Sequence, residues 1–213
     1  EEFNISASVI SVDTENNIVT GKGAVVITDK KGKLIKAENV TYEKSKEFLI
    51  AEGSVEVFDT EGNFIKTDKA SYDKLKEIII TYKNSELVLK EGYNLTSDKI
   101  LYNDMKKTIS SDQKSTLSDI DGNIVRMSMF EYHLEKNLLS SVGKIKVVDV
   151  NKNKYYFKQL HIDTKKKEMI GSDVSVLFDQ ENFGLSKEND PRFVANDIFI
   201  SKNKSNLSKG IFT

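Results

Sequence analysis

The sequence predicts an all-β protein, an antiparallel stacked β-jellyroll whose two sheets face each other across an apolar interior. Two observations predict this fold. Apolar and polar residues alternate over short runs, as in residues 51–57, where Ala51, Val55 and Val57 share one side. The same pattern returns every 30 residues through most of the chain. No segment shows the sustained 3.6-residue period that is typical of a helix.

The 30-residue period is seen in columns of equivalent residues, which hold to about residue 182. The clearest columns are the tyrosines Tyr42, Tyr72, Tyr102 and Tyr132, the glycines Gly32, Gly62, Gly92 and Gly122, and the apolar residues Leu49, Ile79, Ile109 and Leu139. About seven hairpin repeats therefore fill the chain, with an insertion at about 180–192 and a final repeat at 193–213. We expect residues 1–213 to form a single domain.

Each repeat is expected to contain two strands and two turns. The first strands are predicted near 34–42, 49–58, 64–72 and 79–88, with successors 30 residues later. One turn carries Asp-x-x-Gly, in which Asp bonds the backbone ahead and Gly accepts a positive φ. The other turn is charged. The spacing from Ala37 to Val40 breaks the alternation and predicts a β-bulge.

Short turns require antiparallel neighbours, because a parallel return needs a long crossover. The alternate face carries charged residues such as Glu52 and Lys144, so the apolar face must point inward, unlike that of a membrane barrel. The inward positions are candidates either for a closed core or for a slot that binds lipid. These candidates are Ala37, Val40, Tyr42, Leu49, Ala51, Val55, Val57, Ala70, Tyr72, Ile79, Ile100, Tyr102, Ile109, Phe130, Tyr132 and Leu139.

Composition argues against several function classes. The 32 basic and 33 acidic residues give a net charge of −1, which argues against nucleic-acid binding. No apolar run approaches the 18 or more residues of a membrane helix. There is no cysteine, so disulfides and thiolate metal sites are excluded. His133 and His161 lack a partner at metal-ligand spacing, and the aspartates recur as turn residues, so we expect no metal, no cofactor and no enzyme activity.

The repeat itself resembles a known family. Residues 34–74, "LIKAENVTYEKSKEFLIAEGSVEVFDTEGNFIKTDKASYDK", are similar to the OstA-like (organic solvent tolerance) domain, in which an Ala-x-x-Val-x-Tyr strand and an Ala-x-Gly-x-Val strand alternate. Residues 189–213, "NDPRFVANDIFISKNKSNLSKGIFT", resemble the end of the periplasmic domain that precedes the barrel in an outer-membrane member of that family. Three positions depart from the pattern: Ile162 replaces a tyrosine, and Lys83 and Gln113 replace glycines.

This resemblance implies a V-shaped, partly open jellyroll in the periplasm. Its interior would accept the acyl chains of lipopolysaccharide from a like-folded bridge protein and pass them to an outer-membrane barrel with its lipoprotein plug. Since the chain does not begin with Met, a targeting segment is expected to have been removed or left out. Two alternatives remain open: a soluble bridge protein of the same family, or a carbohydrate-binding surface protein that displays aromatic side chains.

The first strand is a candidate partner edge. It runs from Phe3 to Val12, with Ile5, Ala7, Ile10 and Val12 in repeat register, and no Lys, Pro or acidic residue interrupts it. Natural proteins usually protect such an edge unless a partner docks on it. We expect this strand to pair with the terminal strand of the bridge protein by β-augmentation. The alternative is that the strand frays or is covered by the same chain.

Overall fold

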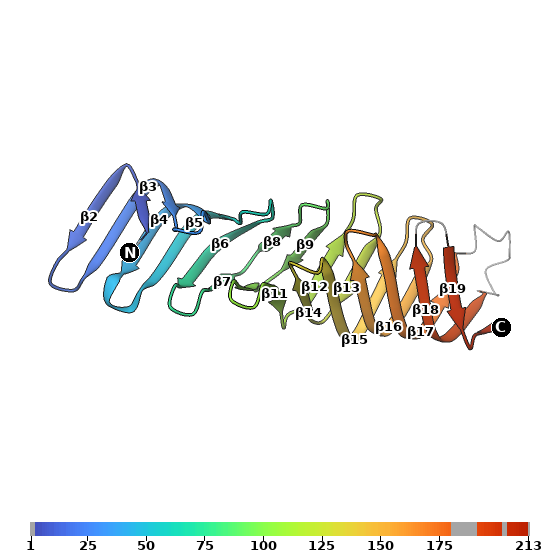
Figure 1. The fold of residues 1–213 in the computed structure, drawn as a ribbon. Coiled ribbons are helices and arrows are strands. Elements are labelled where there is room, and N and C mark those ends of the chain that lie inside the picture. Colours follow the sequence, from blue (N-terminus) through green and yellow to red (C-terminus); the bar gives the residue numbers. More distant parts are fainter. Residues whose placement is uncertain (1–2, 180–190, 202–203, 213) are drawn as a thin grey trace. The chain divides into compact units, whose positions relative to one another are not determined.

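Antiparallel β-strands dominate the computed structural model, which describes residues 3–179, 191–201 and 204–212 (Figure 1). Among these residues the only helical element is the short 3-10 turn η1 (Lys44–Lys46). The predicted all-β antiparallel fold is therefore confirmed. The strands form two compact units: unit 1 is Glu1–Lys90 with Asn94–Ile109, and unit 2 is Glu91–Tyr93 with Ser110–Thr213. The interpretation of residues 1–213 as one domain stays a prediction.

Unit 1 is a series of hairpins that begins with two short strands. β1 and β2 both pair with β3, and β3 to β6 then pair in chain order, each with the next. β6 pairs with both β7 and β8, which pair with β10 and β9 respectively. The strands are β1 (Asn4–Ser6), β2 (Val9–Asp13), β3 (Ile18–Thr28), β4 (Leu34–Glu43), β5 (Phe48–Phe58), β6 (Phe64–Asp73), β7 (Ile78–Tyr82), β8 (Ser85–Val88), β9 (Asn94–Ser97) and β10 (Leu101–Asn103).

Unit 2 continues the same arrangement, and β11 (Thr108–Ser111) lies across the boundary in sequence. β12 pairs with β13, β13 and β14 pair with β15, and β15 to β18 pair in chain order. β18 also pairs with β19 and β20. The strands are β12 (Ser115–Ser118), β13 (Ile124–Met127), β14 (Phe130–His133), β15 (Leu138–Val148), β16 (Lys154–Asp163), β17 (Glu168–Leu177), β18 (Arg192–Ser201), β19 (Lys204–Ser208) and β20 (Ile211–Phe212).

The observed strands match the predicted ones closely, with one systematic difference. The strand predicted at 79–88 is interrupted, because β7 ends at Tyr82 and β8 begins at Ser85. The strands predicted at 94–102, 109–118 and 124–132 are divided in the same way, into β9 and β10, β11 and β12, and β13 and β14. The insertion predicted at about 180–192 lies outside the described residues except for its last two, Pro191 and Arg192, the second of which begins β18.

The predicted bulge is the corner at which each long strand passes from one layer of the unit to the other. The pairing of β4 with β5 shifts register between Lys36 and Asn39, so the shift lies where the alternation breaks. The residues with positive φ are on the facing strand, at Gly53 (φ 80°) and Ser54 (φ 47°). A Cβ on Gly53 would also lie 2.6 Å from the Glu38 carboxylate, so glycine is required twice over.

In the next repeat Lys83 stands in place of this glycine, and side-chain hydroxyls make the hydrogen bonds near the corner. Lys83 and Asn84 both have positive φ, at 63° and 44°, and the ladder is broken there. Thr81 Oγ1 accepts a hydrogen bond from the Ile100 backbone N at 2.8 Å and lies 2.6 Å from Ser85 Oγ. All of these groups are buried, so the hydroxyls satisfy polar atoms that the interrupted ladder leaves without partners.

The Asp-x-x-Gly turns close as the sequence predicts. In the first of them, Asp29 Oδ1 accepts hydrogen bonds from the backbone N of Lys31 and of Lys33, both at 2.9 Å. Gly32, with φ 85°, adopts the left-handed conformation that favours glycine. The turn beginning at Asp59 has the same bonds.

At the turns that begin at Asp59, Asp119 and Asp149, a following asparagine links the turn to the next one. Asn63 Nδ2 donates to Asp59 Oδ2 at 2.7 Å, while Asn63 Oδ1 accepts from the Lys90 backbone N at 3.0 Å. Asn123 and Asn153 make equivalent contacts to their own turn and to the following one. The asparagines therefore hold successive hairpins in register along one edge of each unit.

We predict that Asn63→Ala lowers the free energy of unfolding by about 1–3 kcal/mol, because the buried Asn63 side chain bonds both Asp59 and the Lys90 backbone N, and alanine removes both bonds. Urea denaturation of the variant measures the loss. Thr60→Ala, at the exposed tip of the same turn, is the matched control and should change stability by less than about 0.5 kcal/mol. Equal stability of the two variants would contradict a linking role for Asn63.

Candidate functional site: the space between the two layers

The inward candidates all lie in the interior, where they are packed against one another. Their exposed fractions run from 0% at Val55, Ile100, Ile109 and Leu139 to 8% at Ala37. The two layers face each other, since the Phe3 ring lies 5.1 Å from the Tyr42 ring in an edge-on contact. These columns form a closed core in the structure, so their predicted role in lipid binding stays a prediction.

The layers have a second boundary opposite the corners, where the Asp-x-x-Gly turns of one layer approach the charged turns of the other. We call this boundary the mouth. In unit 1 the mouth is closed by Lys33, whose Nζ lies 3.2 Å from Asp104 Oδ2. The two side chains are only 4% and 5% exposed. Lys33 Nζ also lies over the rings of Tyr72 and Tyr102, at 5.2 and 4.6 Å from their centroids.

Other charged groups surround this buried pair. Lys31 Nζ lies 2.6 Å from Glu77 Oε1 and 3.8 Å from Asp104, and Lys107 also bonds Asp104. Burial raises the pKa of Asp104, but the hydrogen bond from Lys107 and the charge of Lys33 outweigh it, so the pKa lies below its usual value. A lowered carboxyl pKa stabilises the fold above the unfolded value and loses that contribution as the pH falls through the folded value. The mouth of unit 1 is therefore held shut at neutral pH.

We predict that Asp104→Ala lowers the free energy of unfolding by about 3–5 kcal/mol, because it leaves Lys33 buried without its counter-ion. The double variant Lys33→Met/Asp104→Leu should recover most of this loss, since an apolar pair replaces the ion pair. Chemical denaturation of the single and double variants measures both effects. A double variant as unstable as Asp104→Ala would contradict the pairing.

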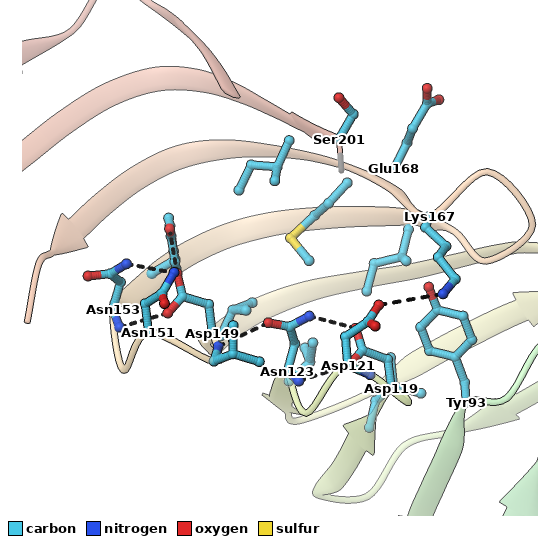
Figure 2. Close-up of a pocket in the computed structure, with 18 residues that line it drawn as sticks. Tyr93, Asp119, Asp121, Asn123, Asp149, Asn151, Asn153, Lys167, Glu168 and Ser201 are labelled. Carbon is cyan, nitrogen blue, oxygen red and sulfur yellow. Dashed lines mark hydrogen bonds and ion pairs between the residues drawn. The ribbon is translucent and has the colours of Figure 1, made fainter. Parts of the chain in front are cut away.

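The mouth of unit 2 contains a pocket of about 490 Å³ (Figure 2). Figure 2 shows Asp119, Asp121 and Asp149 of the turns on one side, and Glu168 and Ser201 on the other. Apolar residues of both layers line its deeper part: Leu117, Val125, Val147, Ile162, Met169 and Ile200. The pocket thus joins an apolar interior to a polar rim, which is the arrangement that an amphiphilic ligand requires.

The pocket lies where the tyrosine column ends. Tyr132 is 1% exposed and its hydroxyl lies 3.3 Å from Thr164 Oγ1. One repeat later Ile162 stands in place of a tyrosine and lines the pocket. Isoleucine lacks the ring and hydroxyl, so it fills less space than the tyrosine of the four preceding repeats. Tyr155, on the facing layer, lines the same pocket and donates to Asp149 Oδ2 at 3.0 Å.

The rim of the pocket is mostly acidic, with one cation. Lys167 Nζ lies 3.5 Å from Asp121 Oδ2 across the mouth, and Lys167 is well exposed. Burial, together with the charges of Asp119 and Asp121, raises the pKa of Tyr93 to about 12. Tyr93 therefore stays neutral and can donate a hydrogen bond throughout the physiological range. The ion pair between Lys167 and Asp121 is long and exposed, so moving the Lys167 side chain costs little free energy.

None of the sixteen inward candidates lines this pocket. These candidates keep the repeat, whereas the pocket lies where the repeat fails at Ile162. That departure was visible in the tyrosine column, and it is the signal that locates the site. The linking asparagines were also missed, although Asn63, Asn123 and Asn153 recur at multiples of 30 residues.

The candidate edge segment forms two short strands, β1 and β2, and its apolar residues differ in burial. Phe3 is buried, whereas Ile10 and Val12 are 47% and 58% exposed on β2. β1 and β2 pair with β3 on one side, and within the described residues no other strand pairs with them. The edge is thus free for a partner strand, and docking there stays a prediction.

The two histidines, possible metal sites and possible membrane helices bear on the other function classes. His133 Nε2 lies 3.3 Å from Glu131, and His161 Nδ1 lies 2.9 Å from Ser140 Oγ. Among the described residues, no three His, Asp or Glu side chains are grouped so as to hold a metal ion. A search of the same residues for a helix of the length and hydropathy needed to cross a membrane gave no candidate.

Comparisons with known proteins give little beyond the fold. No family model matches the chain, and no curated protein matches it. Among solved structures it is similar to LptH from Pseudomonas aeruginosa, described as the LptA homologous periplasmic component of the conserved lipopolysaccharide transport device. That similarity has 15% identity and a TM-score of 0.43, and covers 48% of this chain and 76% of LptH.

Proposed function

We propose that this chain is a periplasmic lipid-transport domain of the OstA-like type, and that the pocket of unit 2 admits acyl chains of lipopolysaccharide. The observation that carries the proposal is the opening at Ile162, where the apolar interior reaches a polar rim. The resemblance of the 30-residue repeat to OstA-like domains supplies the lipid class. The partners that this resemblance implies are a like-folded bridge protein, an outer-membrane barrel and its lipoprotein plug.

The size and chemistry of the pocket support an acyl chain as the ligand. Its volume of about 490 Å³ lies within the range of small-molecule sites. Each methylene that it buries contributes about 0.8 kcal/mol, so a chain of about a dozen carbons gains about 10 kcal/mol before ordering costs. Asp119, Asp149 and Lys167 at the rim would then face the polar part of the lipid.

The two alternatives differ in what they require. A carbohydrate-binding surface protein would display its aromatic column, but Tyr42, Tyr72, Tyr102 and Tyr132 are 1–6% exposed. Lipid transport is therefore favoured over that alternative. A soluble bridge protein and a domain that precedes a barrel would share the same interior, and both fall within the proposal.

Site-specific photo-crosslinking with lipopolysaccharide tests the proposal. We expect a crosslinker at Met169, in the pocket, to capture lipopolysaccharide, while one at the exposed Gln159 on the outer face should not. In the Ile162→Tyr background, capture at Met169 should fall by about tenfold, because a restored tyrosine fills the opening.

Thermal unfolding is the control for Ile162→Tyr, since a variant with an unchanged melting temperature has kept its fold. Equal capture at Met169 and Gln159 would contradict the proposal. So would full capture at Met169 in a folded Ile162→Tyr variant. A crosslinker at Ile100, in the closed interior of unit 1, should capture less than one at Met169.

A further inference from the structure

Unit 2 has a second hollow, of about 640 Å³, on the outer face of its strands. Five cationic side chains line it together with one exposed tyrosine, and no acidic residue does. We call it the basic groove; these residues are Lys114, Arg126, Lys144, Lys146, Lys158 and Tyr156. They lie on or next to β12, β13, β15 and β16, and none of them belongs to the pocket at the mouth.

The cations of the groove are direct neighbours across the sheet. Arg126 pairs with Lys146 in the register of β13 and β15, and Lys146 pairs with Tyr156 in that of β15 and β16. Lys146 Nζ lies 5.8 Å from the centroid of the Tyr156 ring. Like charges directly opposite each other destabilise a sheet, so the fold gains nothing from placing Arg126 beside Lys146.

The same row in unit 1 has the opposite design. Lys36 pairs with Glu56, Glu56 with Lys66, and Lys66 with Glu86, so every cation faces an anion. Arg126 is the repeat equivalent of Lys66, and Lys146 is that of Glu56 and Glu86. The row therefore loses its carboxylates in unit 2 and keeps its cations.

At the corner of the sheet, side-chain charge also changes from negative or neutral in unit 1 to positive in unit 2. Glu38 and Asp68 occupy the repeat position that Lys158 takes in unit 2, and Ser54 and Asn84 occupy that of Lys144. Lys158 lies 3.8 Å from Asp173, in an exposed pair. In the part of the chain that the structure describes, Lys114, Arg126, Lys144 and Lys146 have no ion-pair partner.

The hollow itself follows from short side chains at this corner. In unit 1 the Glu38 side chain lies against Gly53, within 2.6 Å of where a Cβ would stand. In unit 2 the equivalent pair is Ser128 and Gly143, and the serine hydroxyl would lie 3.2 Å from such a Cβ. Serine is two atoms shorter than glutamate and carries no charge. This corner of unit 2 thus carries a shorter side chain beside its glycine and more positive charge than its counterpart in unit 1.

We infer that the basic groove binds a saccharide that carries more than one phosphate group. The cations supply charge-assisted hydrogen bonds to phosphate, and Arg126 offers a bidentate geometry. Tyr156, which is 37% exposed, and the hydroxyls of Ser128 and Thr116 offer a ring face and polar contacts for the sugar. Strands β13 and β16 lie on either side of β15, about 10 Å apart, so one phosphate alone cannot reach all the cations.

A concave site suits a small polyanion better than a flat membrane surface. The inference does not depend on acyl chains entering the interior, because the groove lies on the outer face of the sheet. The two proposals therefore fail or succeed separately.

Calorimetric titration of the full chain with deacylated glucosamine disaccharide bisphosphate tests the inference, with the phosphate-free disaccharide and inorganic phosphate as comparison ligands. We expect the bisphosphate to bind at least about tenfold more tightly than either, because both phosphates and the sugar make contacts. Lys146→Glu should weaken its binding by about tenfold or more. This variant restores the alternation of Lys36, Glu56 and Lys66 and is therefore expected to fold.

Lys106→Glu, on an exposed turn of unit 1, makes the same change in net charge and should leave binding unchanged. A second variant, Lys144→Ser/Lys158→Asp, carries the residues of unit 1 and should also weaken binding. Equal binding of the phosphate-free disaccharide, or of inorganic phosphate, would overturn the inference. Unchanged binding in Lys146→Glu, or an equal loss in Lys106→Glu, would overturn it too, as would tighter binding of anionic vesicles or an acidic peptide than of the bisphosphate.

Discussion

The structure depends on a single constraint: within each unit, the hydrogen-bonded ladder of strands has to turn a corner at every repeat. Two layers can face each other only if each long strand bends, and the bend requires backbone conformations with positive φ such as those of Gly53 and Ser54. Where glycine is missing, at Lys83, the ladder breaks and buried hydroxyls take over its hydrogen bonds. The corner separates an apolar inside from a charged outside, and both candidate sites follow from that separation.

The two units use this architecture differently. In unit 1 the mouth is closed by Lys33 and Asp104, and Lys and Glu alternate in register along the outer row. In unit 2 the mouth holds a pocket beside Ile162, and the outer row keeps cations without carboxylates. Because both units are built from one repeat, each serves as the reference for the other. Differences at equivalent positions are therefore more informative than the features that the units share.

Periodicity predicted the fold well, because hydrogen-bonded strands, Asp turns and inward apolar columns are local properties that recur with the chain. It predicted burial correctly at Tyr42 and Leu49, yet none of the sixteen inward candidates lines the pocket. A pocket is a defect in packing, and it depends on which side chains meet across the layers. Ile162 was recognised as a departure from the tyrosine column, but the space it leaves depends on Met169 and Tyr155 opposite or beside it. The closure by Lys33 and Asp104 joins residues 71 positions apart, which no local pattern indicates.

The central claim is that acyl chains enter the interior at unit 2. Methyl NMR of the chain with bound lipopolysaccharide tests it most directly, using intermolecular nuclear Overhauser effects from the acyl methylenes. The account predicts contacts to the methyl groups of Ile162, Met169 and Ile200, which line the pocket, and none to Ile79 or Ile109 in the closed interior. Contacts to Ile79 and Ile109 alone, or to outward methyl groups such as that of Ile170, would contradict it.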